Sequence, residues 1–304
     1  MQELMVYAGQ LDCYERCNEV IREFTDVEVS TTQIYRLTDK YGTELEKEVS
    51  KQTVLPPLKK QEALYVQADG SMLLTREEGY KEVKVGRIFK SSDCMHSGQK
   101  AGWIKTSQYV AHLGSSKEFT DQMDPLIESY GKGGNQLIFV SDGAIWIKHW
   151  IEDAFPGAVS ILDYYHACEH LHQFSSTQFS DKHQEKIWVS EQKELLLQSE
   201  VLKVIENIEK LAANSKEAQQ LIVYYQSNQE RMDYKRYQQL GCGIIGSGAI
   251  ESAHRTVVQK RMKQSGQRWS IPGAQHMLNL RVIRKNRQWN KIIQLAKQQA
   301  VATA

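Results

Sequence analysis

Long hydrophobic runs and cysteine pairs are scarce in this sequence of 304 residues. No stretch approaches the ~18 consecutive apolar residues that a membrane span requires, and the N-terminus lacks the basic and then apolar layout of a secretory signal. The five cysteines are odd in number and scattered, unlike a disulfide framework, which fits a reducing compartment. We therefore expect an intracellular protein. The only close pair, Cys13 and Cys17, has helical spacing and no second pair nearby, which favours buried packing over zinc.

Acidic residues are absent from position 252 to the end, where eleven lysines and arginines occur. The other 27 basic residues face 37 acidic ones in positions 1–251, so the net charge of +1 conceals a strongly basic C-terminal region. A solvated helical face is the usual explanation of a charge run. An acid-free segment of this length favours a polyanionic partner instead.

The N-terminal part has helical spacing in residues 14–24 and 30–42. Ser30 suits a helix N-cap, and Gly42 is expected to end the second helix. Two helices joined by a short turn have the outline of a helix-turn-helix, whose second helix could enter a major groove of DNA. A plain helical hairpin would look the same.

Strand-like segments follow a boundary that we place at Pro56-Pro57. Residues 63–68, 71–75 and 82–89 predict three antiparallel strands, and Asp69-Gly70 predicts a hairpin turn between the first two. Residues from about 100 to 130 have helical character. The remaining pattern predicts a buried strand at 136–141, a helix at 144–155, a strand at 159–162 and helices only from 166 to about 239.

The predicted fold class is α/β with the order βββαβαβα, interrupted by an all-helical insertion. The predicted regions are an N-terminal helical segment (1–58), a first core part (59–174), the insertion (175–240), and a C-terminal helix with a basic tail (241–304). We find no internal repeat and no low-complexity segment.

Two aspartates, Asp69 and Asp142, each end a predicted strand directly before a glycine. Adjacent strand ends can hold carboxylates close together, and such a cluster is tolerated where a hard cation such as Mg²⁺ shares it. Two such ions can activate an attacking hydroxyl and stabilise a leaving oxygen in phosphoryl transfer. Turn formation alone is the other explanation of each Asp-Gly pair.

A third carboxylate, Glu251, falls in the first turn of a helix that follows the glycine-rich residues 241–248. These glycines match neither the P-loop nor the dinucleotide-binding pattern, so they are expected to allow close approach of a DNA backbone or of the first strand. Cations downstream could bind phosphates, namely Arg255, Lys260, Arg261, Lys263 and Arg268. Trp269 could stack on an unpaired base or belong to the core.

Histidines cluster after the strand at 159–162. His166 and His170 share a helical face, but the glutamate of a His-Glu-x-x-His zinc helix is missing, which disfavours a zinc site. We expect Asp163 to cap this helix, and His166 to support the acids or to contact DNA.

These motifs together resemble DDE transposases of bacterial insertion sequences, of the ISKra4 type, with ISLre2-like proteins and the IS256/Mutator group as wider relatives. The resemblance covers about residues 13–290. It rests on residues 140–147 (VSDGAIWI), 155–158 (FPGA), 162–171 (LDYYHACEHL) and 246–255 (GSGAIESAHR).

The resemblance implies a ribonuclease-H-like core whose acidic triad is Asp69, Asp142 and Glu251, with Asp93 and Asp163 as substitutes for the first. It also implies metal ligation of Mg²⁺ or Mn²⁺ by this triad, a nucleoid-associated protein in the cytoplasm, and action as a homodimer or larger assembly. The expected partners are the terminal inverted repeats of the element and target DNA, which is cut and rejoined without a covalent intermediate. Relatives usually carry a longer N-terminal region, so we expect a truncated copy or a fragment.

Three functions fit the sequence. The first is a DNA transposase acting through metal-dependent cleavage and strand transfer. The second is a non-catalytic DNA-binding protein, such as a decayed copy, which predicts salt-sensitive DNA binding without chemistry. The third is a ribonuclease-H-like nuclease that uses the same triad without preference for element ends.

Overall fold

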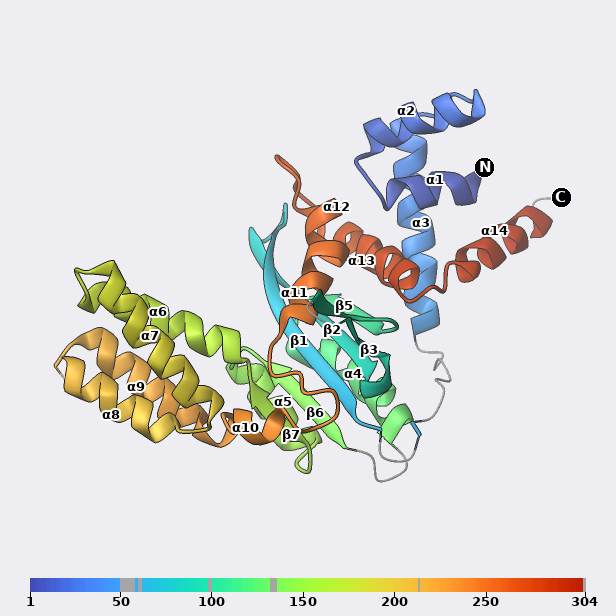
Figure 1. Ribbon diagram of the computed structural model, residues 1–304. Coiled ribbons are helices and arrows are strands. Elements are labelled where there is room, and N and C mark those ends of the chain that lie inside the picture. The colour runs from blue at the N-terminus through green and yellow to red at the C-terminus, as the bar shows by residue number, and fades with distance from the viewer. Residues whose placement is uncertain (50–57, 60–61, 98–99, 132–135, 213, 303–304) are drawn as a thin grey trace.

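A five-stranded mixed sheet lies at the centre of the protein, with helices on both faces (Figure 1). The computed structural model describes residues 1–302 except 50–57, 60–61, 98–99, 132–135 and 213. The predicted boundary at Pro56-Pro57 lies outside the described residues. The strands are β1 (Leu64–Leu74), β2 (Tyr80–Lys90), β3 (Cys94–Ser97), β4 (Lys100–Ile104), β5 (Gln108–Leu113), β6 (Leu137–Ser141) and β7 (Val159–Leu162).

Helices make up most of the remaining described chain. The N-terminal helices are α1 (Gln2–Gly9), α2 (Tyr14–Thr25) and α3 (Thr31–Val49), and those of the middle region are α4 (Ser116–Gly131), α5 (Ile145–Ala154), α6 (Tyr164–Gln178), α7 (Lys182–Leu197), α8 (Val201–Ala212), α9 (Lys216–Asn228) and α10 (Tyr234–Tyr237). The C-terminal helices are α11 (Gly248–His254), the π-helical turn η3 (Arg255–Gln259), α12 (Lys260–Met262), α13 (Ile271–Lys285) and α14 (Asn290–Ala302). Short 3-10 turns are η1 (Ser91–Asp93) and η2 (Gln229–Arg231).

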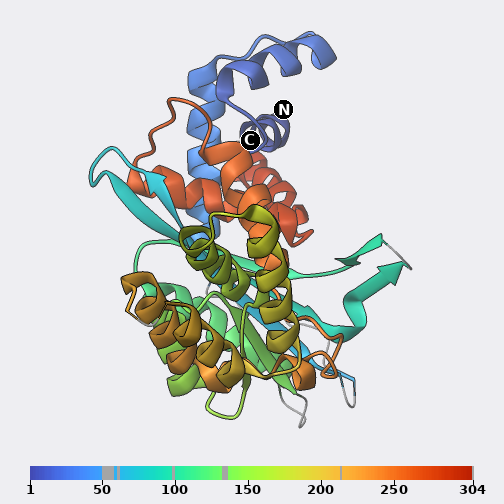
Figure 2. The same ribbon diagram turned by 60° about the vertical axis from the view of Figure 1, so that its left-hand side comes forward.

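The strand order in the sheet is β5-β2-β1-β6-β7. β1, β2 and β5 pair antiparallel, whereas β6 runs parallel to β1 and β7 runs parallel to β6. β6 reads as a nearly continuous apolar run because both of its faces are covered. β3 and β4 form a separate hairpin that projects from the sheet (Figure 2).

The two faces of the sheet carry different helices. On one face, alternate side chains such as Val66 and Ile88 pack with α4 and α5. On the other face, Val83 and Val85 pack with α11, η3 and α13, while Ile138 and Val140 pack with the helical region α6–α10. α6 and α11 therefore lie on the same face of the sheet, so the first helix of the region α6–α10 is a neighbour of the helix that follows this region.

The N-terminal helices share a core with the C-terminal ones, so the two ends of the chain lie side by side (Figure 1). Ser30 caps α3 as predicted, since its hydroxyl oxygen accepts a hydrogen bond of 3.1 Å from the backbone N–H of Gln33. The predicted stop at Gly42 is wrong, because α3 continues to Val49. Gly42 instead allows α13 to approach: a Cβ there would lie 2.4 Å from Cβ of His276.

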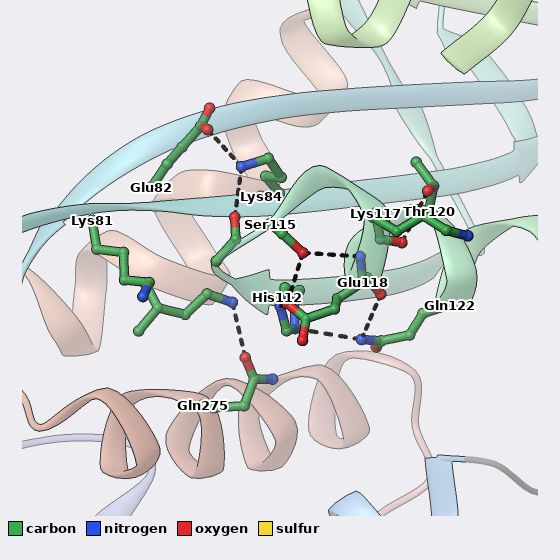
Figure 3. A network of polar contacts seen from close by, with 12 residues as sticks. Lys81, Glu82, Lys84, His112, Ser115, Lys117, Glu118, Thr120, Gln122 and Gln275 are labelled. Atoms are coloured by element: carbon green, nitrogen blue, oxygen red, sulfur yellow. Dashed lines mark hydrogen bonds and ion pairs between the residues drawn. The ribbon is translucent and has the colours of Figure 1, made fainter.

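The hairpin predicted at Asp69-Gly70 is also wrong. β1 runs without interruption through both residues, and the turn lies farther on, where Thr75 N donates to Gly79 O at 2.6 Å. Gly70 leaves room for the neighbouring strand, since a Cβ there would lie 1.8 Å from Glu82 Oε1. Glu82 accepts a hydrogen bond of 2.6 Å from the buried Lys84 ammonium (Figure 3).

The third antiparallel strand differs from the prediction. It is β5, within the region that was predicted to be helical, while the segment at 82–89 is the second strand. The later elements are confirmed: β6, α5 and β7 occur in the predicted order, and helices without strands follow from α6 to α10. In the part of the chain that the structure describes, no helix combines the length and apolarity needed to cross a membrane.

Candidate functional site

The parallel pairing of β1 with β6 brings two of the predicted acids to neighbouring positions. Gln67 lies opposite Val140 in this register, and Asp69 and Asp142 follow two residues later on each strand. Burial, and after it the charge of Asp142, raise the pKa of Asp69 to about 6. Asp69 lies within β1 and not at a strand end as predicted, but the register with β6 still places it beside Asp142.

Glu251 approaches the same place from α11. Its charge also contributes to the raised pKa of Asp69, and its carboxylate is exposed to solvent. The hydroxyl of Ser247 lies 3.4 Å from Glu251 Oε1 and donates to Asp163, which ties the start of α11 to the start of α6. The structure thus brings Asp69, Asp142 and Glu251 to one region of the sheet surface.

Gln67 holds the beginning of α11 against β1. Its amide nitrogen donates to Gly246 O at 3.0 Å, and its amide oxygen accepts the Ile250 N–H at 3.0 Å. Because side chains two residues apart point to the same face of a strand, Gln67 and Asp69 share the face that α11 covers. Glu251 directly follows Ile250, whose backbone N–H is bound by Gln67.

His254 links the helix of Glu251 to the strand of Asp69. Its Nε2 lies 3.0 Å from Asp69 O and 3.5 Å from Asp69 Oδ2, and its Nδ1 lies 3.0 Å from Ser71 Oγ. Burial lowers the pKa of His254 to about 4, so the ring is neutral at pH 7. A neutral ring can donate from Nε2 to Asp69 while Nδ1 accepts from the Ser71 hydroxyl.

Asp163 caps α6 as predicted. Its Oδ1 accepts the Tyr165 N–H at 2.7 Å, and the other oxygen accepts the Ser247 hydroxyl, so this buried carboxylate already has partners. Asp93, the other substitute, lies in η1 at the far end of β2, and neither substitute is among the main causes of the raised pKa of Asp69. This placement favours Asp69 as the first acid.

The histidines of α6 lie near the Asp142 end of the site. His166 and His170 face each other with their Nε2 atoms 3.2 Å apart. The ring of His170 contacts the ring of Tyr224 from α9 in a tilted arrangement, with the ring centroids 4.4 Å apart. The Tyr224 hydroxyl lies 3.5 Å from Asp142 O. The helical middle region therefore contributes to the surroundings of Asp142.

The predicted phosphate-binding cations divide into two groups. Exposed side chains belong to Arg255, Lys260, Lys263 and Arg268. Arg261 is only 2% exposed, lies between the rings of Tyr14 and Trp269, and donates to Gly9 O at 2.9 Å. The predicted phosphate contact of Arg261 is not supported, because its guanidinium is buried and its donors face protein rather than solvent.

Trp269 belongs partly to the core. Its indole nitrogen donates to Met262 O at 3.0 Å, and its ring is half-buried beside Arg261. Of the two roles that the sequence left open for Trp269, packing is the one that its contacts support. Lys263 lies near the acids. Burial lowers the pKa of Lys263, and the negative charge of Asp69 acts in the opposite direction.

Carboxylate oxygens are the donors that a hard divalent cation prefers. Among the described residues, no three side chains of His, Cys, Asp or Glu already form a group that could hold a metal ion. The charges of Asp142 and Glu251 both act on Asp69, but the three described acids do not form a closed cage of ligands. Any divalent cation bound here would have to draw them closer.

A sequence model of the uncharacterised protein family UPF0236 matches residues 3–299. The chain belongs to this family. A search of curated proteins finds no match to the chain. The family description assigns no activity to UPF0236, so the function of this member has to come from its site.

Sequence reasoning missed several residues that build the site of this UPF0236 member. Gln67 stands two positions before Asp69, and His254 stands three positions after Glu251, so each shares a face with an acid. That spacing was the available signal. Tyr224 carried no such signal, because only the folding of α9 against α6 brings it near Asp142.

The raised pKa of Asp69 predicts a stability effect. Asp69→Asn should raise the free energy of unfolding of the metal-free protein by about 1–2 kcal/mol at pH 8, where the partly exposed carboxylate is ionised despite its raised pKa. Between about pH 4 and 6 the unfolded chain loses the proton that folded Asp69 retains, so the ionised carboxylate costs stability above that window.

Urea unfolding at pH 4 and pH 8 would measure this effect. The exposed Asp153, at the end of α5, provides the matched control as Asp153→Asn. The gain should appear at pH 8 for Asp69→Asn alone and largely disappear at pH 4, where folded Asp69 keeps its proton and no charge is buried. Identical behaviour of the two variants at pH 8 would show that Asp69 is neither buried nor held close to other acids.

Proposed function

We propose that the protein is a divalent-metal-dependent enzyme of phosphoryl transfer on DNA, of the DDE transposase type. The observation that carries this proposal is the convergence of three carboxylates from separate elements. The parallel register brings Asp69 on β1 beside Asp142 after β6, and the bonds of Gln67 and His254 hold α11, which carries Glu251, against β1. Such a cluster is costly without a cation, and functional sites are where such costs are retained.

The topology supports the same proposal. Three antiparallel strands come first, and a helix, a parallel strand, a helix, a second parallel strand and a helix follow, which is the order βββαβαβα once the β3–β4 hairpin is set aside. The acids lie in the first strand, after the fourth strand and on a late helix. This arrangement agrees with a ribonuclease-H-like core that contains a helical insertion from α7 to α10.

The acids suit Mg²⁺ or Mn²⁺ because all three offer oxygen donors at a partly open surface. When bound, a pair of such ions would activate an attacking hydroxyl and stabilise the leaving oxygen of a phosphodiester. The protein's part is to orient the carboxylates. Gln67 fixes α11 on β1, and His254 fixes the Asp69 backbone against the same helix.

Exposed cations next to Glu251 support DNA as the substrate. Arg255 follows Glu251 by one helical turn, Lys260 and Lys263 continue along the same segment, and Arg268 lies in the loop beyond. These side chains can neutralise phosphates on both sides of a scissile bond. The absence of acidic residues from position 252 onward leaves this positive charge uncompensated within the segment.

Incubation of the protein with Mg²⁺ and duplex DNA that carries the sequences flanking its gene tests the proposal. We expect cleavage at paired inverted repeats and joining of the released ends to a second duplex. Cleavage of any duplex without end preference would favour a general nuclease. Salt-sensitive binding without cleavage in either Mg²⁺ or Mn²⁺ would favour a non-catalytic DNA-binding protein.

A further inference from the structure

A basic hollow lies at the edge of the sheet, away from the three acids. It has a volume of about 370 Å³ and is formed by the segment that leads from β4 into β5 and by the C-terminal end of α13. Four cationic side chains line it, namely Lys105, Arg284, Lys285 and Arg287, and its lining contains no aspartate or glutamate. None of these four cations was singled out from the sequence.

The cations have no acidic partner within the described residues. In the part of the chain that the structure describes, no carboxylate oxygen lies within 4.0 Å of the side-chain nitrogens of these four cations. Arg284 lies over the ring of Tyr7 at 5.3 Å and Lys285 over the ring of Tyr109 at 5.7 Å, so the rings hold the side chains without neutralising them. Burial and neighbouring cations lower the pKa of Lys285. An anion would relieve this repulsion.

Capping of α13 does not explain the cluster. Basic residues often satisfy free carbonyl groups in a last helical turn. Here the backbone does so, since Val282 O accepts from Asn286 N at 2.8 Å and Ile283 O accepts from Gln288 N at 2.9 Å. The Asn286 side chain bonds both backbone groups of Tyr109, at 2.8 and 3.0 Å, which fixes the hollow to β5.

The hollow is connected to the proposed active site. Arg87, only 8% exposed, donates from Nε to Ser107 Oγ in the wall of the hollow at 2.9 Å and from Nη1 to Ala249 O at 2.7 Å. Ala249 lies two residues before Glu251. In addition, Lys260 of the basic segment is among the cations that act on Lys285, so the positive potential extends from that segment to the hollow.

We propose that this hollow binds backbone phosphates of duplex DNA, at a distance from the phosphodiester that reacts. The inference rests on the proposed function because it takes DNA as the ligand. The duplex would lie across the exposed cations next to Glu251 and reach the hollow with a flanking segment. The rigid connection through Arg87 then keeps the flanking segment and the helix of Glu251 in a fixed relation.

Binding without divalent metal tests this inference separately from any cleavage. Fluorescence anisotropy of a labelled duplex of about 30 base pairs, in EDTA and over a range of NaCl concentrations, gives both affinity and its salt dependence. Two variants remove different pairs of cations, Arg284→Gln with Lys285→Gln and Lys105→Gln with Arg287→Gln. The control, Lys186→Gln with Lys216→Gln, removes two exposed lysines of the helical middle region. Far-ultraviolet circular dichroism checks that each variant is folded.

Each of the two variants of the hollow should bind the duplex at least about tenfold more weakly than wild type. The slope of log affinity against log salt should be shallower by about 1–2, since each lost phosphate contact contributes about 0.9. The control should keep the wild-type slope. Equal slopes and affinities for the variants of the hollow and the control variant would overturn the inference.

The two proposals fail in different ways. If the variants of the hollow bind like wild type while wild type still cleaves DNA with Mg²⁺, only the hollow is wrongly assigned. If Asp142→Asn still cleaves DNA, the proposed catalytic function falls, while reduced binding by the variants of the hollow in EDTA continues to support the hollow.

Discussion

Asp142→Asn should reduce Mg²⁺-dependent DNA cleavage by about a thousandfold. The substitution keeps the side-chain shape but removes one of the charges that would hold the metal ions, whose stabilisation of the transition state amounts to several kcal/mol at about 1.4 kcal/mol per tenfold in rate. Asp142 directly follows β6, and its Oδ1 accepts the Ala144 N–H at 3.0 Å, which an asparagine oxygen can also do. Single-turnover cleavage rates on end-bearing DNA measure the loss.

The control for this experiment separates chemistry from binding. Asp153→Asn removes the same charge from an exposed position on α5 and should cleave at the wild-type rate. In EDTA, Asp142→Asn should bind DNA as tightly as wild type or more tightly, because it removes a negative charge near the phosphates. Unchanged cleavage by Asp142→Asn would mean that the acids do not form the catalytic site.

Gly42→Ala should lower the free energy of unfolding by about 2 kcal/mol, in the range for overpacked interiors. In an exposed helix the same change would be favourable by up to about 1 kcal/mol. Here the new Cβ would lie 2.4 Å from Cβ and 2.7 Å from O of His276, so α3 and α13 would have to separate. The core that the two chain ends share would then lose its packing.

Chemical denaturation compares this variant with Gly157→Ala. A Cβ at Gly157 would meet nothing within 4 Å, so the control should stay within about 0.5 kcal/mol of wild type. A shift of similar size in both variants would show that the close crossing of α3 and α13 is absent in solution.

A short sequence pattern was sufficient to predict an element where only one local structure fits the pattern. The apolar run at 136–141 and the cap at Asp163 led to β6 and the start of α6. Asp69-Gly70 has the composition of a hairpin turn, and nothing nearby distinguishes that turn from an uninterrupted strand. Cross-strand contacts decide the matter, because pairing with β2 along the whole of β1 leaves no room for a turn there.

Contacts between distant parts of the chain explain the other differences between the predicted and the observed elements. β5 has only six residues and directly precedes a helix, so its alternation was too short to stand out from the helical pattern. Gly42 carries a helix-ending signal, but the approach of α13 requires a glycine in the middle of α3.

The candidate site was predictable in part. The positions of Asp142 and Glu251 followed from their motifs and Asp69 from topology, whereas their mutual proximity depends on the register of β1 with β6. The roles of Gln67, His254 and Arg87 depend on where α11 lies on the sheet. The buried position of Arg261 depends on the N-terminal helices, which contribute Tyr14 and Gly9.

The central claim is that Asp69, Asp142 and Glu251 form one cation-binding site. Titration of Mn²⁺ into the metal-free protein, followed by the electron paramagnetic resonance signal of free Mn²⁺, tests it without DNA or turnover. We predict uptake by wild type and by Asp153→Asn, and at least about tenfold weaker uptake by Asp69→Asn, Asp142→Asn and Glu251→Gln. Equal uptake by all five proteins would contradict the claim.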